Sequence, residues 1–396
     1  MEKICFVVQR YGLEVNGGAE LQCRQFAEHL LSRYKDIHVL TTKAIDYMTW
    51  ENVYEKDFEV INGIKVHRFS VDHPRNQKEF DEVNGRFYQG LLKTKKNEYE
   101  WMEKQGPASS KLIQYIVDNK NEYDVFVFFT YLYYTTALGV KEVYDKAIVI
   151  PEAHDDPFYK MRIFDDVFLS VRGILYNTEE ERQLIQKVYH NEHVPSLLGG
   201  TGVEIPDNIS AERFKKKYKL DKYVIYVGRI DSAKNCHILF EYFQEYKKRN
   251  NNQLKLVLMG KTVIEIPKQE DIVSLGFVSD EDKFDGIAGA ECLVLPSEFE
   301  SLSMVVLEAM SVYTPVMVYG KCAVLRGHCI KSNGAFYYNN FFEFEGQLNY
   351  LLIDSKEKKQ MVKNAYYYVQ DNFRWEIIMQ RLCKLISLVI DKRDGE

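Results

Sequence analysis

Two glutamates, Glu300 and Glu308, are the side chains whose types and spacing point most directly to chemistry. An apolar run at 292–295 predicts a buried strand ahead of them, and the residues from about Ser303 onward have helical periodicity. If most of the segment is helical, a rise of about 1.5 Å per residue separates the two carboxylates by roughly 12 Å. That is too wide for a shared metal ion or for the ~5 Å pair of a retaining glycosidase, but it suits a long polar ligand whose phosphate faces the first helical amides. Taken alone, two solvated carboxylates beside a helix start explain the pair equally well.

Two cations, Arg229 and Lys234, follow a strand-like run at 223–227 and a glycine, Gly228. The turn after the strand lets both cations converge over the carboxyl end of the strand, where doubly wound folds bind ligands. An arginine can hold a phosphate through two hydrogen bonds, and a lysine adds a point charge. Without further context, a surface Arg and Lys near a turn is the more common origin of such a pair.

A glycine-rich loop, Asn16-Gly17-Gly18-Ala19-Glu20, joins the first expected strand to the helix that follows it. Paired glycines such as Gly17 and Gly18 let backbone amides approach an anion at a helix N-terminus, although glycines are also common at such turns for geometric reasons. The loop lacks the full Gly-x-Gly-x-x-Gly dinucleotide fingerprint, which argues against an oxidoreductase.

One histidine, His154, follows an expected strand at 147–150 and precedes two acids, Asp155 and Asp156. If the sheet is parallel, this histidine lies at the edge where ligands bind, and the neighbouring carboxylates favour its charged form. A packed or solvated histidine is the competing explanation.

The Glu-x7-Glu stretch, the Gly-Arg-x4-Lys-Asn stretch at 228–235 and the glycine loop resemble motifs of the retaining GT-B glycosyltransferases of family four, the glycosyl transferases of group 1. In that family the second glutamate holds the ribose hydroxyls and the first lies beside the donor sugar. The resemblance therefore implies these roles for Glu308 and Glu300. The usual Gly-Phe-Gly after the first glutamate is Ser301-Leu302-Ser303 here, which keeps the backbone donors and adds side chains near the sugar.

The same resemblance implies the other contacts with the sugar donor. Arg229 and Lys234 would hold the donor diphosphate, and His154 would orient the sugar and stabilise charge that develops near it. The catalytic roles fall on His154, Arg229, Lys234 and Glu300. The further donor-binding residues implied are Gly17, Gly18, Val278, Leu302, Ser303 and Met304.

Short apolar runs alternate with amphipathic stretches along the whole chain, which predicts two doubly wound parallel α/β sheets. The expected strands lie at 3–8, 37–42, 64–69, 124–129, 147–150 and 173–176, then at 223–227, 254–259, 272–275, 292–295 and 315–318. With the resemblance, this implies a GT-B architecture of two facing Rossmann-like domains. The N-terminal, acceptor-side domain would cover 1–205 and the nucleotide-sugar domain 206–375. A C-terminal helix at 376–396 would cross back to the first domain.

Composition narrows the class of protein further. The 396 residues suffice for two or three domains, and the net charge of −6 does not favour nucleic acid as a partner. No apolar stretch reaches the roughly 18 residues that cross a bilayer, and the first residues have no signal-peptide layout. Seven scattered cysteines fit reduced core residues. We therefore expect a cytoplasmic enzyme.

One acidic motif, Asp280-Glu281-Asp282, has the Asp-x-Asp form that chelates manganese in the other major glycosyltransferase fold. Ser279 ahead of it, with Asp282, predicts a helix N-cap instead, and we favour capping. We therefore expect neither a metal site nor any cofactor other than the nucleotide-sugar co-substrate.

The resemblance implies retaining, metal-independent transfer of a hexose such as mannose, glucose or GlcNAc from a UDP- or GDP-sugar. The acceptor would be a glycan or a lipid-linked sugar in surface polysaccharide or glycoconjugate biosynthesis. Cations and aromatics interleave at 86–88 and 93–101, so peripheral contact with the inner face of a membrane remains an alternative to a plain surface helix. The alternative functions are a sugar phosphorylase of the same fold and a catalytically inactive partner of an active enzyme.

Overall fold

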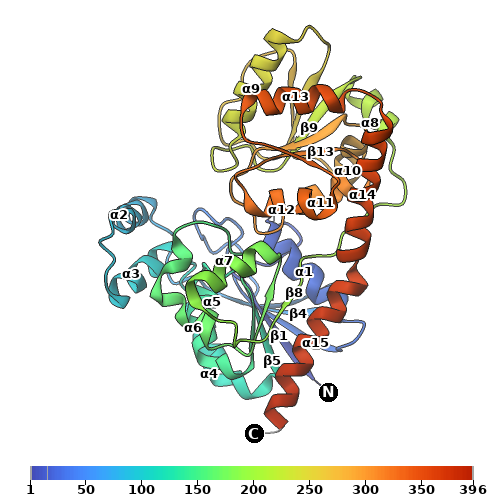
Figure 1. Ribbon diagram of the computed structural model, residues 1–396. Coiled ribbons are helices and arrows are strands. Elements are labelled where there is room, and N and C mark those ends of the chain that lie inside the picture. Colours follow the sequence, from blue (N-terminus) through green and yellow to red (C-terminus); the bar gives the residue numbers. More distant parts are fainter. Residues whose placement is uncertain (1, 16, 395–396) are drawn as a thin grey trace. The chain divides into compact units, whose positions relative to one another are not determined.

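The computed structural model of the chain describes residues 2–15 and 17–394, with side chains through residue 391 (Figure 1). Asn16, the first residue of the glycine loop, lies outside the described residues. The chain divides into two compact units, Met1–Gly200 with Ile378–Glu396 and Thr201–Ile377. The boundaries expected from the sequence fall after residues 205 and 375.

The first unit is built on an eight-stranded sheet of order β3-β4-β2-β1-β5-β6-β7-β8. All neighbouring strands are parallel except β3 and β4, which form an antiparallel edge. The strands are β1 Lys3–Val7, β2 Asp36–Thr42, β3 Phe58–Ile61, β4 Ile64–Phe69, β5 Val125–Phe129, β6 Ala147–Ile150, β7 Gly173–Tyr176 and β8 Ser196–Leu198. The parallel strands bring the loops that follow them to one edge of the sheet.

Helices pack against both faces of this sheet, as successive residues of β5 show. Phe128 and Phe129 point to opposite faces, because side chains alternate along a strand. Phe129 packs against Phe26 of α1, with ring centroids 5.8 Å apart, whereas a Cβ on Gly139 of α5 would lie 2.8 Å from the ring of Phe128. The helices of this unit are α1 Gly18–Leu30, α2 Gln77–Tyr88, α3 Lys95–Gln105, α4 Ser110–Asn119, α5 Tyr134–Val143, α6 Asp165–Leu169 and α7 Glu179–Tyr189, with short 3-10 turns η1 Lys120–Glu122, η2 Tyr144–Lys146, η3 Phe158–Lys160 and η4 Arg162–Phe164.

The second unit has a six-stranded, wholly parallel sheet of order β11-β10-β9-β12-β13-β14. Its strands are β9 Tyr223–Val227, β10 Lys255–Met259, β11 Ile272–Gly276, β12 Cys292–Leu295, β13 Val316–Tyr319 and β14 Phe336–Tyr338. Its helices are α8 Ala211–Tyr218, α9 Cys236–Arg249, α10 Asp280–Ala288, α11 Met304–Ser311, α12 Ala323–Ser332, α13 Phe341–Leu351 and α14 Lys356–Asn372. The strands of its core are almost entirely buried, which their apolar runs predict.

The last helix, α15 Trp375–Asp394, starts in the second unit and continues into the first. Within the first unit, the side chain of Leu385 lies against Gly173 at the start of β7, where a Cβ would approach it to 2.8 Å. The expected pair of parallel Rossmann-like sheets with a returning C-terminal helix is therefore confirmed.

Three strands were not expected from the sequence: β3, β8 and β14. They are short, with four, three and three residues. In β3 the side chains of Phe58 and Val60 are exposed, so the strand carries no apolar face directed at the core. Edge strands of this kind lack the pattern that identifies a strand in sequence.

Two stacked imidazoles, His38 of β2 and His67 of β4, lie on the first sheet with ring centroids 5.1 Å apart. Nδ1 of His38 is 2.9 Å from Nε2 of His67, and its Nε2 is 2.9 Å from the carboxylate of Asp36, which Lys65 also contacts at 2.8 Å. Burial lowers the pKa of His38 to about 4 against the opposing effect of Asp36. Burial, followed by the charges of Lys3 and Lys65, also lowers the pKa of His67.

We expect the stability of the protein to decrease as the pH falls from about 6.5 toward 4. In this window His38 takes up a proton in the unfolded chain but not in the folded one. For one such group, this lowers the free energy of unfolding by at most about 1.4 kcal/mol per pH unit. The lowered pKa of Asp36 affects stability only below its own ordinary value, outside this window. Urea midpoints measured between pH 4 and 8 should have a shallower slope for His38→Asn than for the wild type. His73→Asn, at an exposed position, is the control, and an unchanged slope in His38→Asn would contradict the assignment.

Candidate active site

The two glutamates lie on different kinds of structure after β12. Glu308 is in the middle of α11 and is 9% exposed, whereas Glu300 lies in the loop that precedes the helix. The helix covers Met304–Ser311, so residues 304–308 of the interval are helical and residues 300–303 are not. The separation of roughly 12 Å, which assumes that most of the segment is helical, stays a prediction.

Glu300 forms an ion pair with Lys234, one of the two cations found from the sequence. Lys234 Nζ is 2.7 Å from Glu300 Oε1, and the carboxylate is largely buried. Lys234 lies between β9 and α9, and β9 is the sheet neighbour of β12, so the two loops meet at the carboxyl ends of adjacent strands. The structure thus brings together a cation and a carboxylate that are 66 positions apart in sequence.

The second cation, Arg229, forms an ion pair with Asp231. The carboxylate of Asp231, which is buried, also accepts a hydrogen bond of 2.8 Å from the backbone N–H of Lys234. One acidic side chain therefore fixes both cation-bearing positions of the turn. Sequence reasoning missed Asp231, although its place between the two cations was a usable signal.

The turn that carries these cations depends on two glycines. Gly228 and Gly260, which follow β9 and β10, have φ angles of 147° and 137° in the region that favours glycine. A Cβ on Gly260 would lie 2.0 Å from the carbonyl oxygen of Gly228, so the two loops approach as closely as backbone allows. The hydroxyl of Tyr226 donates a 2.6 Å hydrogen bond to the carbonyl of Arg229 and holds the turn from inside.

Glu308 has its own lysine partner, Lys283 of α10, which the sequence analysis missed. Lys283 Nζ is 2.9 Å from Glu308 Oε1 and 3.2 Å from Asp280 Oδ1. Burial by itself lowers the pKa of Lys283, but Glu308 and Asp280 oppose it and leave the pKa above its ordinary value. Each glutamate of the pair is therefore charge-balanced by one lysine. The spacing of residues in the sequence could not predict this contact, because Lys283 and Glu308 lie on different helices.

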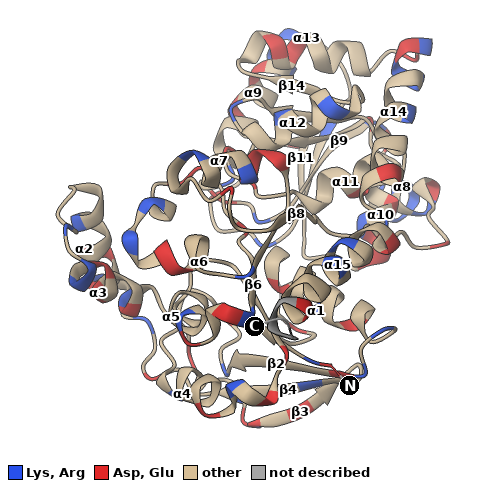
Figure 2. Cartoon of the chain, turned by 60° about the horizontal axis from the view of Figure 1, so that its bottom comes forward, with Lys and Arg blue, Asp and Glu red and all other residues tan. Residues whose placement is uncertain are grey.

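The acidic motif at the start of α10 belongs to a helix N-cap, as the favoured interpretation predicts, and its carboxylates form ion pairs with lysine and arginine side chains. The hydroxyl of Ser279 accepts a 3.1 Å hydrogen bond from the N–H of Asp282, which confirms the N-cap. The Asp282 carboxylate is 2.7 Å from Lys217, and Arg213 pairs with Asp285 at 2.5 Å, so acidic and basic residues lie side by side on α8 and α10 (Figure 2). Among the described residues, no three His, Cys, Asp or Glu side chains are grouped as metal ligands.

The segment that replaces Gly-Phe-Gly has a left-handed residue at its end. Ser303 precedes α11 with φ 70° and ψ 79°, and its buried hydroxyl has no hydrogen-bond partner within the structure described. The side chain of Leu302 is in the core and its carbonyl lies 2.8 Å from Nε2 of His328, so only its amide can contribute to a ligand site. Met304 is the first residue of the helix, where amides have no partner inside the helix.

Val278 lies in the loop after β11 and packs partly against the core of the second unit. Its side chain is therefore partly engaged in packing. The neighbouring Phe277 is 74% exposed.

In the first unit, Gly17 and Gly18 begin α1 but differ in what surrounds them. A Cβ on Gly17 would lie 2.1 Å from the carboxylate of Glu20, whereas one on Gly18 would meet nothing within 4 Å. Glu20 is buried and pairs with Arg10 at 2.5 Å, and it accepts a 2.8 Å hydrogen bond from Gln9. Packing inside the protein therefore accounts for Gly17 and leaves open space at Gly18.

His154 lies close to one of its two acidic neighbours. Its Nδ1 lies 2.8 Å from Asp156 Oδ2, and the Asp156 carboxylate also accepts hydrogen bonds from the Tyr131 hydroxyl (3.1 Å) and the Phe158 N–H (2.7 Å). Burial, followed by the charge of Asp156, raises the pKa of Tyr131 well above its ordinary value, so this phenol remains a hydrogen-bond donor. Sequence reasoning identified the acids beside His154 but missed Tyr131.

Solved structures with the same fold identify the architecture. Sucrose-phosphate synthase from Thermosynechococcus elongatus aligns with a TM-score of 0.70 at 15% identity, over 99% of this chain and 100% of that chain. HepE from Anabaena, solved in complex with UDP-glucose, aligns with a TM-score of 0.70 at 15% identity, over 98% and 100%. The fold is GT-B, with two parallel-sheet Rossmann-like domains.

Sequence comparison adds a domain match within the second unit. Residues 208–367 match the family model of Glycosyl transferases group 1. An uncharacterized glycosyltransferase of Methanocaldococcus jannaschii is 24% identical over 43% of this chain and 46% of that protein. Processive diacylglycerol alpha-glucosyltransferase of Acholeplasma laidlawii is 26% identical over 50% of this chain and 62% of that protein, so the chain spans about half the length of these curated relatives. Together these matches support a GT-B glycosyltransferase.

The contact between Lys283 and Glu308 generates a stability prediction. Lys283→Met leaves the Glu308 carboxylate without its cation. We expect a loss of about 2–3 kcal/mol, less than the ~3–5 kcal/mol of a fully buried pair, because Lys283 retains some exposure. Adding Glu308→Gln should restore much of this loss, since no charge is then left unpaired. Urea unfolding measures each variant, with the exposed Lys363→Met as control. Wild-type stability in Lys283→Met would show that the pair contributes nothing.

Proposed function

We propose that this chain transfers a hexose from a nucleoside diphosphate sugar to a glycan or lipid-linked acceptor, with retention of anomeric configuration and with no metal or cofactor. The observation that carries the proposal is the Lys234–Glu300 ion pair beside Arg229, at the carboxyl ends of neighbouring strands. A cationic pair suits a diphosphate, and an adjacent carboxylate suits the hydroxyls of a sugar attached to it.

The proposed role of Lys234 is to change partner when the sugar donor binds. In the protein alone its ammonium group is held by Glu300, so it is already positioned and its charge is balanced. A diphosphate oxygen takes over the ammonium group, and the freed Glu300 accepts hydrogen bonds from the sugar. Arg229, Lys234 and the first amides of α11 then stabilise the negative charge of the leaving diphosphate.

Glu308 is proposed to hold the ribose. Lys283 is bonded to Oε1 of this carboxylate, which leaves Oε2 to accept hydrogen bonds from the ribose hydroxyls. The ion pair fixes the rotamer of Glu308, so the acceptor oxygens are in place before the nucleotide arrives.

His154 is proposed to orient the donor sugar and to stabilise charge near it, with Gly17 and Gly18 contacting the donor phosphate or sugar through their backbone. Asp156 fixes the imidazole through Nδ1, which directs Nε2 away from that contact. In this scheme the acceptor attacks the face from which the nucleotide leaves, and the leaving phosphate takes the acceptor proton. The chain then needs no dedicated catalytic base.

The comparisons suggest where to look for substrates. HepE was solved with UDP-glucose, and the Acholeplasma relative is named a diacylglycerol glucosyltransferase, so we propose UDP-glucose as the first donor and a lipid-linked sugar among the first acceptors. Over the described residues no helix is long and apolar enough to span a bilayer. All seven cysteines are buried and unpaired, which suits the reducing cytoplasm that we propose as the location.

The segment at 86–101, where cations and aromatics interleave, is only partly engaged within the protein. In that segment Trp101 is buried and donates to the Asn84 side chain, and Arg86 pairs with Glu100 at 2.9 Å. Tyr88 and Leu91 of the same segment are 65% and 50% exposed, so peripheral contact of this segment with a membrane stays part of the proposal.

Lys234→Ala should lower kcat by about 10² or more with folding intact, because one of the two cations on the leaving diphosphate is lost. Release of nucleoside diphosphate from UDP-glucose, UDP-GlcNAc and GDP-mannose measures the rate, and Lys363→Ala, an exposed lysine on α14, is the matched control. A rate for Lys234→Ala near that of the control would remove Lys234 from the site. Phosphate-dependent cleavage of a disaccharide, with no release from any nucleotide sugar, would replace the proposal with a phosphorylase.

A further inference from the structure

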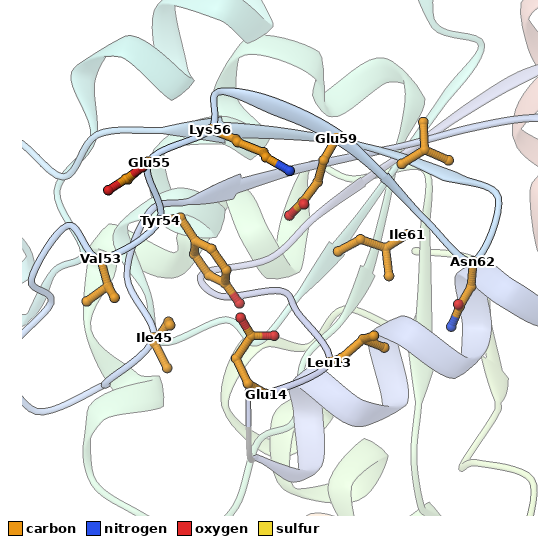
Figure 3. Close-up of a pocket in the computed structure, with 11 residues that line it drawn as sticks. Leu13, Glu14, Ile45, Val53, Tyr54, Glu55, Lys56, Glu59, Ile61 and Asn62 are labelled. Carbon is orange, nitrogen blue, oxygen red and sulfur yellow. The ribbon is translucent and has the colours of Figure 1, made fainter.

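A pocket of about 640 Å³ lies in the first unit, away from the residues considered so far (Figure 3). The loop after β1 contributes Glu14, the loop after β2 contributes Tyr54, Glu55 and Lys56, and β3 contributes Glu59. The loops after β1 and β2 lie at the carboxyl edge of the sheet, as does the loop after β6 with His154, whereas Ile61 at the end of the antiparallel β3 lies toward the opposite edge. Four strands separate β3 from β6.

The ring of Tyr54 is a fixed aromatic surface within this pocket. The guanidinium of Arg68 lies 3.6 Å from the ring centroid, and this side chain is fully buried. Arg68 is held by Glu59 at 2.6 Å and donates a 2.5 Å hydrogen bond to the carbonyl of Tyr11. Because Arg68 covers one face and does not line the pocket, Tyr54 presents its other side to the pocket. Figure 3 shows the ring standing among the lining side chains.

The polar groups of the pocket are mainly hydrogen-bond acceptors. Three lining side chains are carboxylates, Glu14, Glu55 and Glu59, against the single cation Lys56. Arg68 uses only Oε1 of Glu59, so the second oxygen remains available. In Figure 3 the Glu14 carboxylate and the Tyr54 hydroxyl point toward each other, and burial together with Glu14 raises the pKa of Tyr54 above its ordinary value.

These features define the ligand by its chemistry. Glu59 is balanced by Arg68, so Glu14 and Glu55 against Lys56 leave a net negative charge that disfavours an anionic ligand, whereas carboxylates accept hydrogen bonds from hydroxyl or ammonium groups. A rigid aromatic ring offers an apolar surface for the C–H face of a ring, and the volume is typical of small-ligand pockets. We propose that this pocket binds a neutral or amino sugar, the sugar part of the acceptor; this inference rests on the proposed glycosyl transfer.

An apolar rim adds a way to distinguish two sources of that sugar. Leu13, Val53 and Val60 line the pocket and are 61%, 53% and 59% exposed. The alkyl part of a lipid-linked sugar would cover these side chains and bind more tightly than the sugar alone, because apolar surface leaves water. A soluble glycan would have no such advantage.

The test is a ligand-observed NMR titration of the full chain with methyl β-D-glucopyranoside, glucosamine and glucuronate. We expect the first two sugars to bind and glucuronate to bind more weakly. Tyr54→Ala should weaken binding about tenfold or more through loss of the ring. Glu14→Lys, at an exposed position that should tolerate the change, should weaken binding of glucosamine and improve that of glucuronate. Tyr144→Ala, an exposed tyrosine of the same unit, is the control.

The inference is overturned if glucuronate binds as well as the glucoside, if no sugar binds, or if both pocket variants bind like the control. Octyl β-D-glucoside below its micellar concentration separates the sources: tighter binding than the methyl glucoside indicates a lipid-linked acceptor, and equal binding a soluble glycan. Thermal stabilisation by UDP is measured in parallel. If UDP stabilises the protein but no sugar binds, only the inference of sugar binding in the pocket is refuted. If a sugar binds but UDP has no effect, the proposed glycosyl transfer is refuted.

Discussion

The ion pair between Lys234 and Glu300 is the interaction on which the candidate site depends. It ties the loop after β9 to the loop after β12, and a carboxylate so little exposed would be costly without a cation beside it. Lys283 and Glu308 repeat the arrangement on neighbouring helices. Both glutamates are therefore held by a lysine, and a ligand meets side chains that are already in place.

Backbone geometry supports these side chains at specific points. The close approach of Gly228 and Gly260 lets the turn with Arg229 lie directly above the sheet. Ser303 adopts a left-handed conformation where the resembled family has glycine, which costs about 1 kcal/mol or more for a residue with a Cβ. Strain of this kind persists where surrounding structure enforces it, as the buried α11 does here.

The long apolar strands and the order of elements were predictable, because buried parallel strands leave continuous apolar runs in the sequence. Strands β3 and β8 were not, since edge strands as short as these leave no such run. Arg229, Lys234 and Glu300 were found from local spacing, but Asp231 and the pairing of Lys234 with Glu300 were not. The Lys283–Glu308 contact joins residues 25 positions apart on different helices, and only tertiary packing creates it. The left-handed turn at Ser303, which precedes α11, was not expected from the sequence. The pocket around Tyr54 arises from two loops and an edge strand, whose sequences have no periodicity.

The central claim is that the second unit binds a nucleoside diphosphate through its own cations. The most direct measurement is thermal stabilisation of the purified protein by UDP, GDP, ADP, TDP and NAD, each with EDTA present. The account predicts that one nucleoside diphosphate stands out, since a ligand at 100 times its Kd adds about 2.7 kcal/mol of stability. Stabilisation that appears only when manganese replaces EDTA, or no stabilisation by any nucleotide, would contradict it.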